Sequence, residues 1–170
     1  PVRQCRYCGT GSAVDSEFNV VGVDTGGQAP PPRPRLTATT SACGMCGTTA
    51  VDDLRERLHA LPPGPPFDLA VVAAVPDAVE GTAELFGVTG AVHAAVAFDR
   101  EGAPVIGRED IGRHNAVDKV VGRLLLDGAL PAGDLGLYVS GRASFEIVQK
   151  AWAAGMATVV AVSAPSSLAV

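Results

Sequence analysis

The pattern of apolar and polar positions is clearest near the end of the chain. Residues 135–140 and 157–163 are nearly continuous apolar runs, which are typical of strands buried on both faces. Residues 145–154 between them carry apolar positions at helical spacing, and Gly155 follows. The order strand, helix, strand predicts two parallel strands joined by a right-handed crossover.

The middle of the chain predicts a hairpin followed by a helix. Residues 90–98 and 104–107 are strand-like, and the Asp99-Arg100-Glu101-Gly102 stretch between them has the composition of a turn. A helical stripe of apolar residues then ends before Gly128. Its members are Val117, Val120, Val121, Leu124 and Leu125.

The first part of the chain gives weaker patterns. Residues 18–23 are rich in residues that favour strands, whereas residues 26–35 contain four prolines and two glycines and predict a surface connection. Apolar residues at helical spacing predict a helix over 51–61, which the prolines after it must end. The apolar run 67–75 predicts a buried strand, and residues 76–86 predict a short helix.

These elements together predict an α/β fold: a three-layer domain with a mixed sheet and flanking helices. A chain of 170 residues fits one domain. Its 47% hydrophobic and 18% charged residues predict a folded protein, and its net charge of -5 argues against a nucleic-acid surface. No apolar run is long enough to span a membrane, and Pro1-Val2-Arg3 shows no signal-peptide pattern. We therefore expect no nucleic-acid or membrane partner.

The four cysteines form two CxxC pairs, Cys5/Cys8 and Cys43/Cys46. Without a secretory signal the expected setting is the reducing cytoplasm, where such pairs serve metal, redox or sulfur chemistry. The four thiolates could form a zinc site, although the gap between Cys8 and Cys43 is wider than a compact zinc ribbon needs. A fixed redox dithiol fits poorly with the glycines around Cys43 and Cys46.

Two further kinds of cysteine chemistry make different demands on the sequence, that of a zinc deaminase and that of a sulfur carrier. Zinc deaminases carry a Glu two residues after a His or Cys ligand, and no His or Cys of this sequence has one. A sulfur carrier needs an activated thiolate on a loop that can reach a donor and an acceptor. Cys43, between Ala42 and Gly44 and ahead of a predicted helix, suits that role, and Cys46 could serve as a second carrier or a resolving thiol.

Polar residues gather in two other places. His114 and Asp118 are four residues apart and share one helix face, as do Asn115 and Lys119. The two predicted parallel strands end in similar small polar stretches, residues 140–144 and 163–167. Strand ends of this kind favour anions, and Arg142 adds a guanidinium fork suited to phosphate.

Four motifs of the chain resemble the formate dehydrogenase accessory sulfurtransferase family (FdhD/NarQ type). They occur in the order of that family and cover residues 40–47, 109–119, 140–146 and 163–170. The most specific is the run Gly-Arg-His-Asn-x-x-Asp-Lys, which begins at Gly112. The resemblance implies a homodimer with a core like that of cytidine deaminases.

The resemblance also implies a function. Members of the family take sulfane sulfur from a cysteine desulfurase and pass it to the molybdenum cofactor, in its bis-guanylyl form, before that cofactor enters formate dehydrogenase. Cys43 matches the usual persulfide carrier, and Cys46 is expected to support it as part of a sulfurtransferase site. No metal ligands are assigned, and guanosine diphosphate (GDP) is the expected mimic of the bound substrate.

The residues predicted to bind this substrate come from both polar regions. We expect Ser140, Gly141, Arg142, Ser144 and Ser163 to hold phosphates of a guanine dinucleotide, with the same cavity lined by His114, Asn115, Asp118 and Lys119. Residues 1–170 are expected to form one sulfurtransferase domain without the family's N-terminal and extreme C-terminal segments. The extra cysteine, Cys5, keeps a four-cysteine zinc module with a structural role as the alternative.

Overall fold

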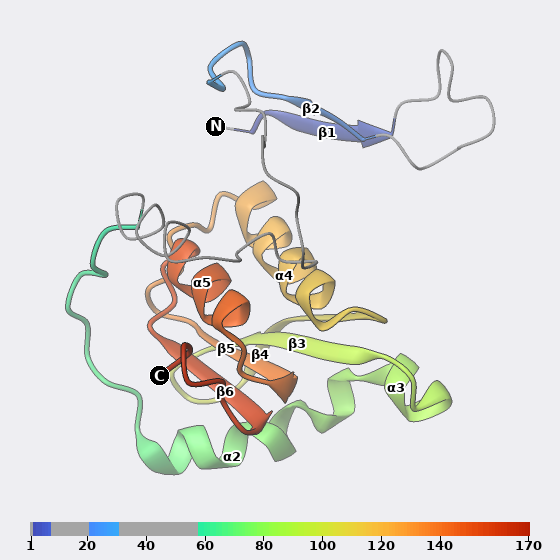
Figure 1. Cartoon of the computed structure of the whole chain (residues 1–170), viewed down its shortest axis with the longest axis vertical. Coiled ribbons are helices and arrows are strands. Elements are labelled where there is room, and N and C mark those ends of the chain that lie inside the picture. The colour runs from blue at the N-terminus through green and yellow to red at the C-terminus, as the bar shows by residue number, and fades with distance from the viewer. Residues whose placement is uncertain (1, 8–20, 31–57) are drawn as a thin grey trace. The chain divides into compact units, whose positions relative to one another are not determined.

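The computed structural model describes residues 2–7, 21–30 and 58–170 (Figure 1). The contacts divide the chain into two compact units, Pro1–Thr39 and Thr40–Val170, and the single sulfurtransferase domain expected over 1–170 stays a prediction. In the first unit β1 (Gln4–Tyr7) pairs antiparallel with β2 (Val21–Asp24). The strand predicted over 18–23 is therefore confirmed in its described part. Most of the helix predicted over 51–61 lies outside the described residues.

The second unit is built on a four-stranded mixed sheet with the order β4-β3-β5-β6. Its strands are β3 (His93–Phe98), β4 (Pro104–Asp110), β5 (Gly136–Arg142) and β6 (Thr158–Ser163). Strand β3 pairs antiparallel with both β4 and β5, whereas β5 and β6 are parallel. The predicted hairpin and the predicted parallel pair are both confirmed.

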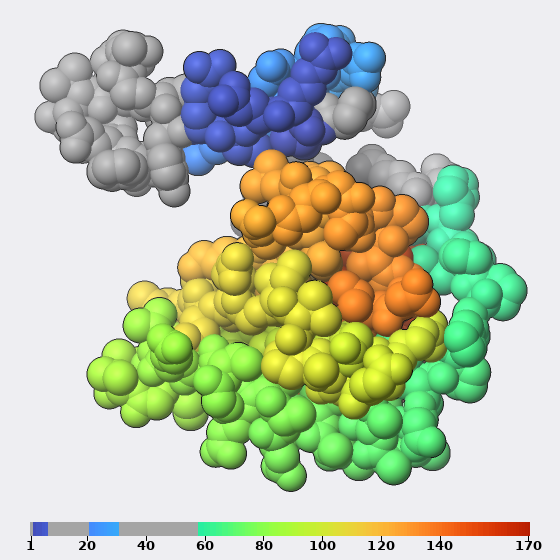
Figure 2. Space-filling view, turned by 180° about the vertical axis from the view of Figure 1, so that it is seen from behind, coloured from blue at the N-terminus to red at the C-terminus, as the bar shows by residue number. Residues whose placement is uncertain are grey.

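Helices cover both faces of this sheet. The helices are α2 (Leu69–Val79), α3 (Glu84–Thr89), α4 (Arg113–Leu126) and α5 (Phe145–Ala153), with a 3₁₀ turn η1 (Glu80–Thr82). Helices α4 and α5 lie on one face and α2 on the other (Figure 1). Seen from behind, the green residues of α2 run below the yellow residues of the β3–β4 hairpin (Figure 2). The predicted α/β fold with flanking helices is confirmed.

The alternation of side chains along β3 separates two cores. Ala95 and Ala97 belong to the core shared with α4 and α5, whereas Val96 and Phe98 belong to the core shared with α2. The buried residues of α4 recur every three or four positions, as one helix face requires. They are Ala116, Val117, Val120 and Leu124. Small alanines on β3 allow the helix to approach the sheet closely.

The strand predicted over 67–75 is wrong. Helix α2 occupies these residues, and the Asp68 side chain caps it by accepting a hydrogen bond from the Ala70 N–H at 2.7 Å. Only Val75 and Val79 of this helix are buried. A short apolar run fits a buried strand and a helix equally well by periodicity, and the Asp68 cap decides between them. Pro76 lies inside the helix and does not start a new one.

The end of the helical region after Pro76 and the burial of two aromatic side chains also differ from the sequence predictions. Where the sequence predicts a helix over 76–86, the helical region continues through α3 and ends at Gly90, in the left-handed conformation with φ 61°. Phe145 and Trp152 lie at helical positions that favour the core on sequence grounds, but both are only partly buried. The Trp152 indole N–H donates to the His59 carbonyl at 2.8 Å, so one edge of the ring faces a polar group. None of the helices in the described ranges is both long and apolar enough to cross a bilayer.

Candidate functional site

The residues predicted to hold phosphates lie together at the ends of the two parallel strands. Ser140, Gly141 and Arg142 end β5, Ser144 is the N-cap of α5, and Ser163 ends β6. Arg142 and Ser163 are register partners. The Ser166 N–H donates to the Ala143 carbonyl at 3.0 Å and ties the segments after the two strands to each other.

Ser140 takes part in the sheet itself. Its hydroxyl oxygen accepts a hydrogen bond from the Ala94 N–H at 2.9 Å, and the side chain is partly buried. The serine therefore joins β3 to β5 and has its hydroxyl proton left to donate.

His114, in the first turn of α4, faces the first turn of α5. Its Nε2 atom is 3.4 Å from the Ser144 hydroxyl and 3.9 Å from the Glu146 carboxylate. Partial burial lowers the pKa of His114, the positive charge of Arg113 lowers it further, and Glu146 opposes both. The lowered pKa of His114 favours a neutral imidazole at pH 7. Its Nε2 atom can then donate a hydrogen bond to the Ser144 hydroxyl or accept one from it, depending on the tautomer.

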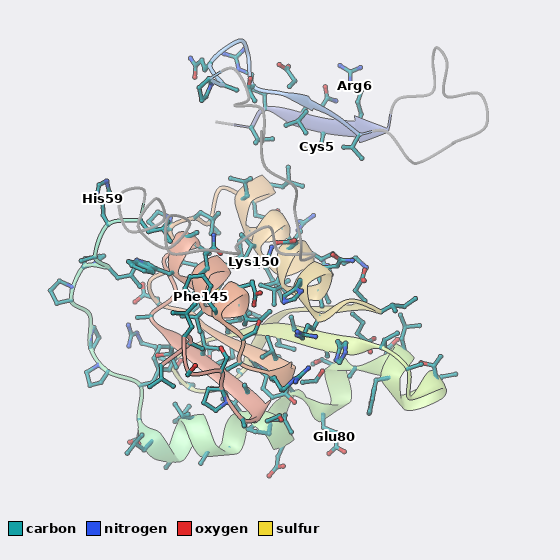
Figure 3. All side chains as sticks on the ribbon, in the orientation of Figure 1. Cys5, Arg6, His59, Glu80, Phe145 and Lys150 are labelled. Atoms are coloured by element: carbon teal, nitrogen blue, oxygen red, sulfur yellow. The ribbon has the colours of Figure 1, made fainter. Side chains whose placement is uncertain are left out.

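Asp118 follows His114 by one turn and faces the same neighbouring helix. The Lys150 ammonium of α5 donates to its carboxylate and forms an ion pair with it. Figure 3 shows Lys150 on the side of α5 that faces α4. The shared face predicted for His114 and Asp118 is therefore the face that contacts α5.

Asn115 and Lys119 contact a different element, the end of β4. The Asp110 carboxylate accepts from the Asn115 amide at 3.1 Å and the Gly112 N–H at 2.9 Å, and it pairs with the Lys119 ammonium at 2.6 Å. Lys119 also donates to the Glu109 carbonyl at 2.9 Å. These bonds hold the turn between β4 and α4.

Hydrogen bonds to the ionised carboxylate explain the acidity of Asp110. The Lys119 bond is the largest cause, followed by those of Gly112 and Asn115, and together they lower the pKa of Asp110 to about 2. Partial burial acts in the opposite direction and is outweighed.

The four polar residues of α4 that were predicted to line one substrate cavity thus divide into two groups. His114 and Asp118 contact α5 beside the phosphate-type residues, whereas Asn115 and Lys119 contact Asp110. A role of all four in binding the same substrate stays a prediction.

The predicted sulfur-carrying residues Cys43 and Cys46 lie outside the described residues, as does Cys8. Cys5 lies on β1 and is exposed. Within residues 2–7, 21–30 and 58–170, no group of three or more His, Cys, Asp or Glu side chains could hold a metal ion.

A family model described as the FdhD/NarQ family matches residues 4–170. The chain belongs to this family. Among its FdhD/NarQ relatives, the sulfur carrier protein FdhD of Nocardia farcinica is 47% identical over 172 residues, which cover 99% of this chain and 61% of that protein. The sulfur carrier protein FdhD of Anaeromyxobacter dehalogenans is 51% identical over 143 residues, which cover 80% of this chain and 49% of that protein.

A solved FdhD/NarQ-type structure supports the same conclusion. The crystal structure of a candidate formate dehydrogenase accessory protein from Desulfotalea psychrophila aligns with a TM-score of 0.56 and 30% identity. The alignment covers 68% of this chain and 48% of that one. The chain spans less than two thirds of the length of each of these relatives. Neither their names nor the residues that the structure describes support a zinc module.

The structure adds two basic residues that were not among the predicted site residues of this FdhD/NarQ chain. His93 of β3 and Arg113 of α4 both lie next to Gly141 of β5. The pairing of β3 with β5 ends at Ala95 and Val139, two residues short of His93 and Gly141. The sequence signal for His93 is its position at the start of β3, the strand that pairs antiparallel with β5.

Replacing Asp110 by asparagine is expected to lower the free energy of unfolding at pH 7 by about 1–2 kcal/mol, because the amide loses a charge-assisted hydrogen bond to Lys119. Urea denaturation measures the change. The matched control is Asp127→Asn, which removes the exposed i,i+4 pair of Arg123 and Asp127 and is expected to change the free energy by less than about 0.5 kcal/mol.

The pH dependence of this difference follows from the lowered pKa. The folded pKa of about 2 lies below the ordinary value of 3.8, so Asp110 stabilises the fold above pH 3.8, and this contribution is lost as the pH falls toward 2. The wild type and Asp110→Asn are therefore expected to converge in stability over that window. A constant difference down to pH 2 would contradict the role given to the carboxylate.

Proposed function

We propose that this chain carries persulfide sulfur from a cysteine desulfurase to the bis-guanylyl molybdenum cofactor, for the maturation of formate dehydrogenase. The observation that carries the proposal is the match of residues 4–170 to the FdhD/NarQ family, together with relatives named sulfur carrier proteins at 47% and 51% identity. The CxxC pair Cys43/Cys46 supplies the thiols that such a carrier needs.

The sulfur transfer has a defined chemistry. The Cys43 thiolate attacks the terminal sulfur of the desulfurase persulfide, whose S–S bond breaks as the donor cysteine leaves as a thiolate. Cys43 then holds the persulfide. Attack of the Cys46 thiolate on the Cys43 sulfur forms a disulfide and releases hydrosulfide for the substrate, and the two thiols supply the two electrons.

Features of the described residues support an anionic substrate. The parallel strands β5 and β6 end near the point where helix α5 begins. Arg142 and Ser163, the last residues of these strands, are exposed. Backbone N–H groups and the helix dipole favour phosphate at such a place. The guanine dinucleotide portions of the molybdenum cofactor carry phosphates, and GDP serves as a mimic of them. A cytidine-deaminase-like core and a homodimer belong to the same proposal.

Sulfur loading can be tested by intact-mass measurement after incubation with a cysteine desulfurase and cysteine. The wild type is expected to gain one sulfur atom that a reductant removes, and Cys43→Ala is expected to gain none. The matched control is Cys5→Ala, since Cys5 is an exposed cysteine of β1 and is not among the residues proposed to carry sulfur. An undiminished gain of sulfur on Cys43→Ala would overturn the assignment of Cys43.

A further inference from the structure

Arg113, the first residue of α4, has a buried guanidinium Nε with no hydrogen-bond partner. The other basic residues of α4 and α5 have carboxylate partners, in the pairs Lys119–Asp110, Arg123–Asp127 and Lys150–Asp118. Within the described ranges no carboxylate pairs with Arg113. The Arg113 side chain as a whole is partly exposed, but a buried Nε–H group without an acceptor is unfavourable, and an anion that reaches it would supply a bond that the described side chains do not.

The surroundings of Gly141 show where such an anion fits. A Cβ atom built on Gly141 would lie 3.6 Å from the Arg113 Cδ and 3.6 Å from the His93 Nδ1. Two basic side chains, one from α4 and one from β3, thus flank the backbone near the end of β5. Both distances are ordinary van der Waals contacts, so the missing side chain at Gly141 leaves a space of about the size of a methyl group, into which one phosphate oxygen could fit.

Two helix N-termini add to the positive potential of this region. Helix α4 begins after Gly112 and α5 after Ser144, and neither cap residue makes a side-chain hydrogen bond to the first turn. The first N–H groups of both helices therefore keep their partial positive charge. The guanidinium fork of Arg113 matches the paired oxygens of a phosphate.

We propose that Arg113 and His93 bind a phosphate group of the guanine nucleotide portion of the substrate, and that the absence of a side chain at Gly141 leaves room for one of its oxygens. The inference rests on the proposed function, because it assigns residues to the nucleotide that this function requires. It places the phosphate on the α4 side of β5, in addition to the residues predicted at the ends of β5 and β6.

The experiment compares the binding of GDP and of guanosine to the full chain by equilibrium dialysis. The wild type is expected to bind GDP more tightly than guanosine. Arg113→Gln is expected to weaken GDP binding about tenfold or more and to leave guanosine binding unchanged, because one charge-assisted bond to phosphate is lost. The matched control is Arg123→Gln, on the same helix, whose guanidinium pairs with Asp127 and whose removal should leave both affinities unchanged.

A second variant separates the site from the charge of Arg113. Gly141→Ala places a methyl group at ordinary contact distance from both basic side chains, so the fold should tolerate it while the space for phosphate is filled. We expect it to weaken GDP binding at least about fivefold, with a small change in the melting temperature. Loss of GDP binding in both variants, with guanosine binding retained, supports the inference.

Two results would overturn it. One is a wild type that binds GDP no better than guanosine, and the other is unchanged GDP affinity in Arg113→Gln. Neither result bears on sulfur loading, which is measured on Cys43 in the wild type without nucleotide. A wild type that binds GDP through Arg113 but gains no sulfur from a desulfurase would instead contradict the sulfur-carrier proposal.

Discussion

Replacing Cys43 by alanine is expected to leave the formate dehydrogenase of the cell inactive, with a loss of about a thousandfold or more. A methyl group cannot form a persulfide, and removal of the nucleophile from a covalent mechanism removes the whole pathway that depends on it. The measurement is formate oxidation in extracts of cells that lack the wild-type chain and carry each variant.

Two companion variants make this result interpretable. Cys5→Ala changes the exposed cysteine of β1 and should restore full activity. Cys46→Ala should retain sulfur on Cys43 but deliver it poorly, because the resolving thiol is absent. Equal activity of Cys43→Ala and Cys5→Ala extracts would show that the sulfur does not travel through Cys43.

The strand–helix–strand unit near the end of the chain could be predicted from the sequence because its apolar pattern is compatible with only one arrangement. Two continuous apolar runs around an amphipathic helix can be buried only as a parallel pair with a crossover, and β5, α5 and β6 form that unit. The run 67–75 had two solutions, since an alanine- and valine-rich segment can be buried as a strand or as one face of a helix. The Asp68 cap was the signal that distinguished them.

The candidate site was predictable to the extent that topology determines it. The ends of adjacent parallel strands meet at one edge of a sheet, so the proximity of Arg142 and Ser163 followed from the strand–helix–strand order. The partners of individual side chains did not follow. Asp110 is bound to Lys119 and Asn115 through the geometry of a turn, and His93 approaches Gly141 through an antiparallel register that the sequence pattern does not fix.

The contact between Gly136 and Phe98 explains why a glycine begins β5. The two residues are register partners, and a Cβ atom on Gly136 would lie 2.2 Å from the Cζ of the Phe98 ring. The ring is fully buried and packs edge to face against Phe67, with 5.6 Å between the ring centroids. A side chain at Gly136 would therefore require the buried ring, or the strand, to shift.

Gly136→Ala is expected to lower the free energy of unfolding by about 3 kcal/mol, at the upper end of the range for overpacked cores. Chemical denaturation measures the change. The matched control is Gly122→Ala on α4, where an added Cβ meets nothing within 4 Å and better helix propensity should raise stability by about 0.5–1 kcal/mol.

The physical cause can be isolated by removing the ring. Phe98→Ala alone should lower stability by about 3–5 kcal/mol, because it leaves a cavity in the core shared with α2. In that background Gly136→Ala should cost less than about 1 kcal/mol, since the new methyl group enters the space of the missing ring. Additive losses in the double variant would mean that backbone strain at Gly136, and not overlap with Phe98, excludes a side chain there.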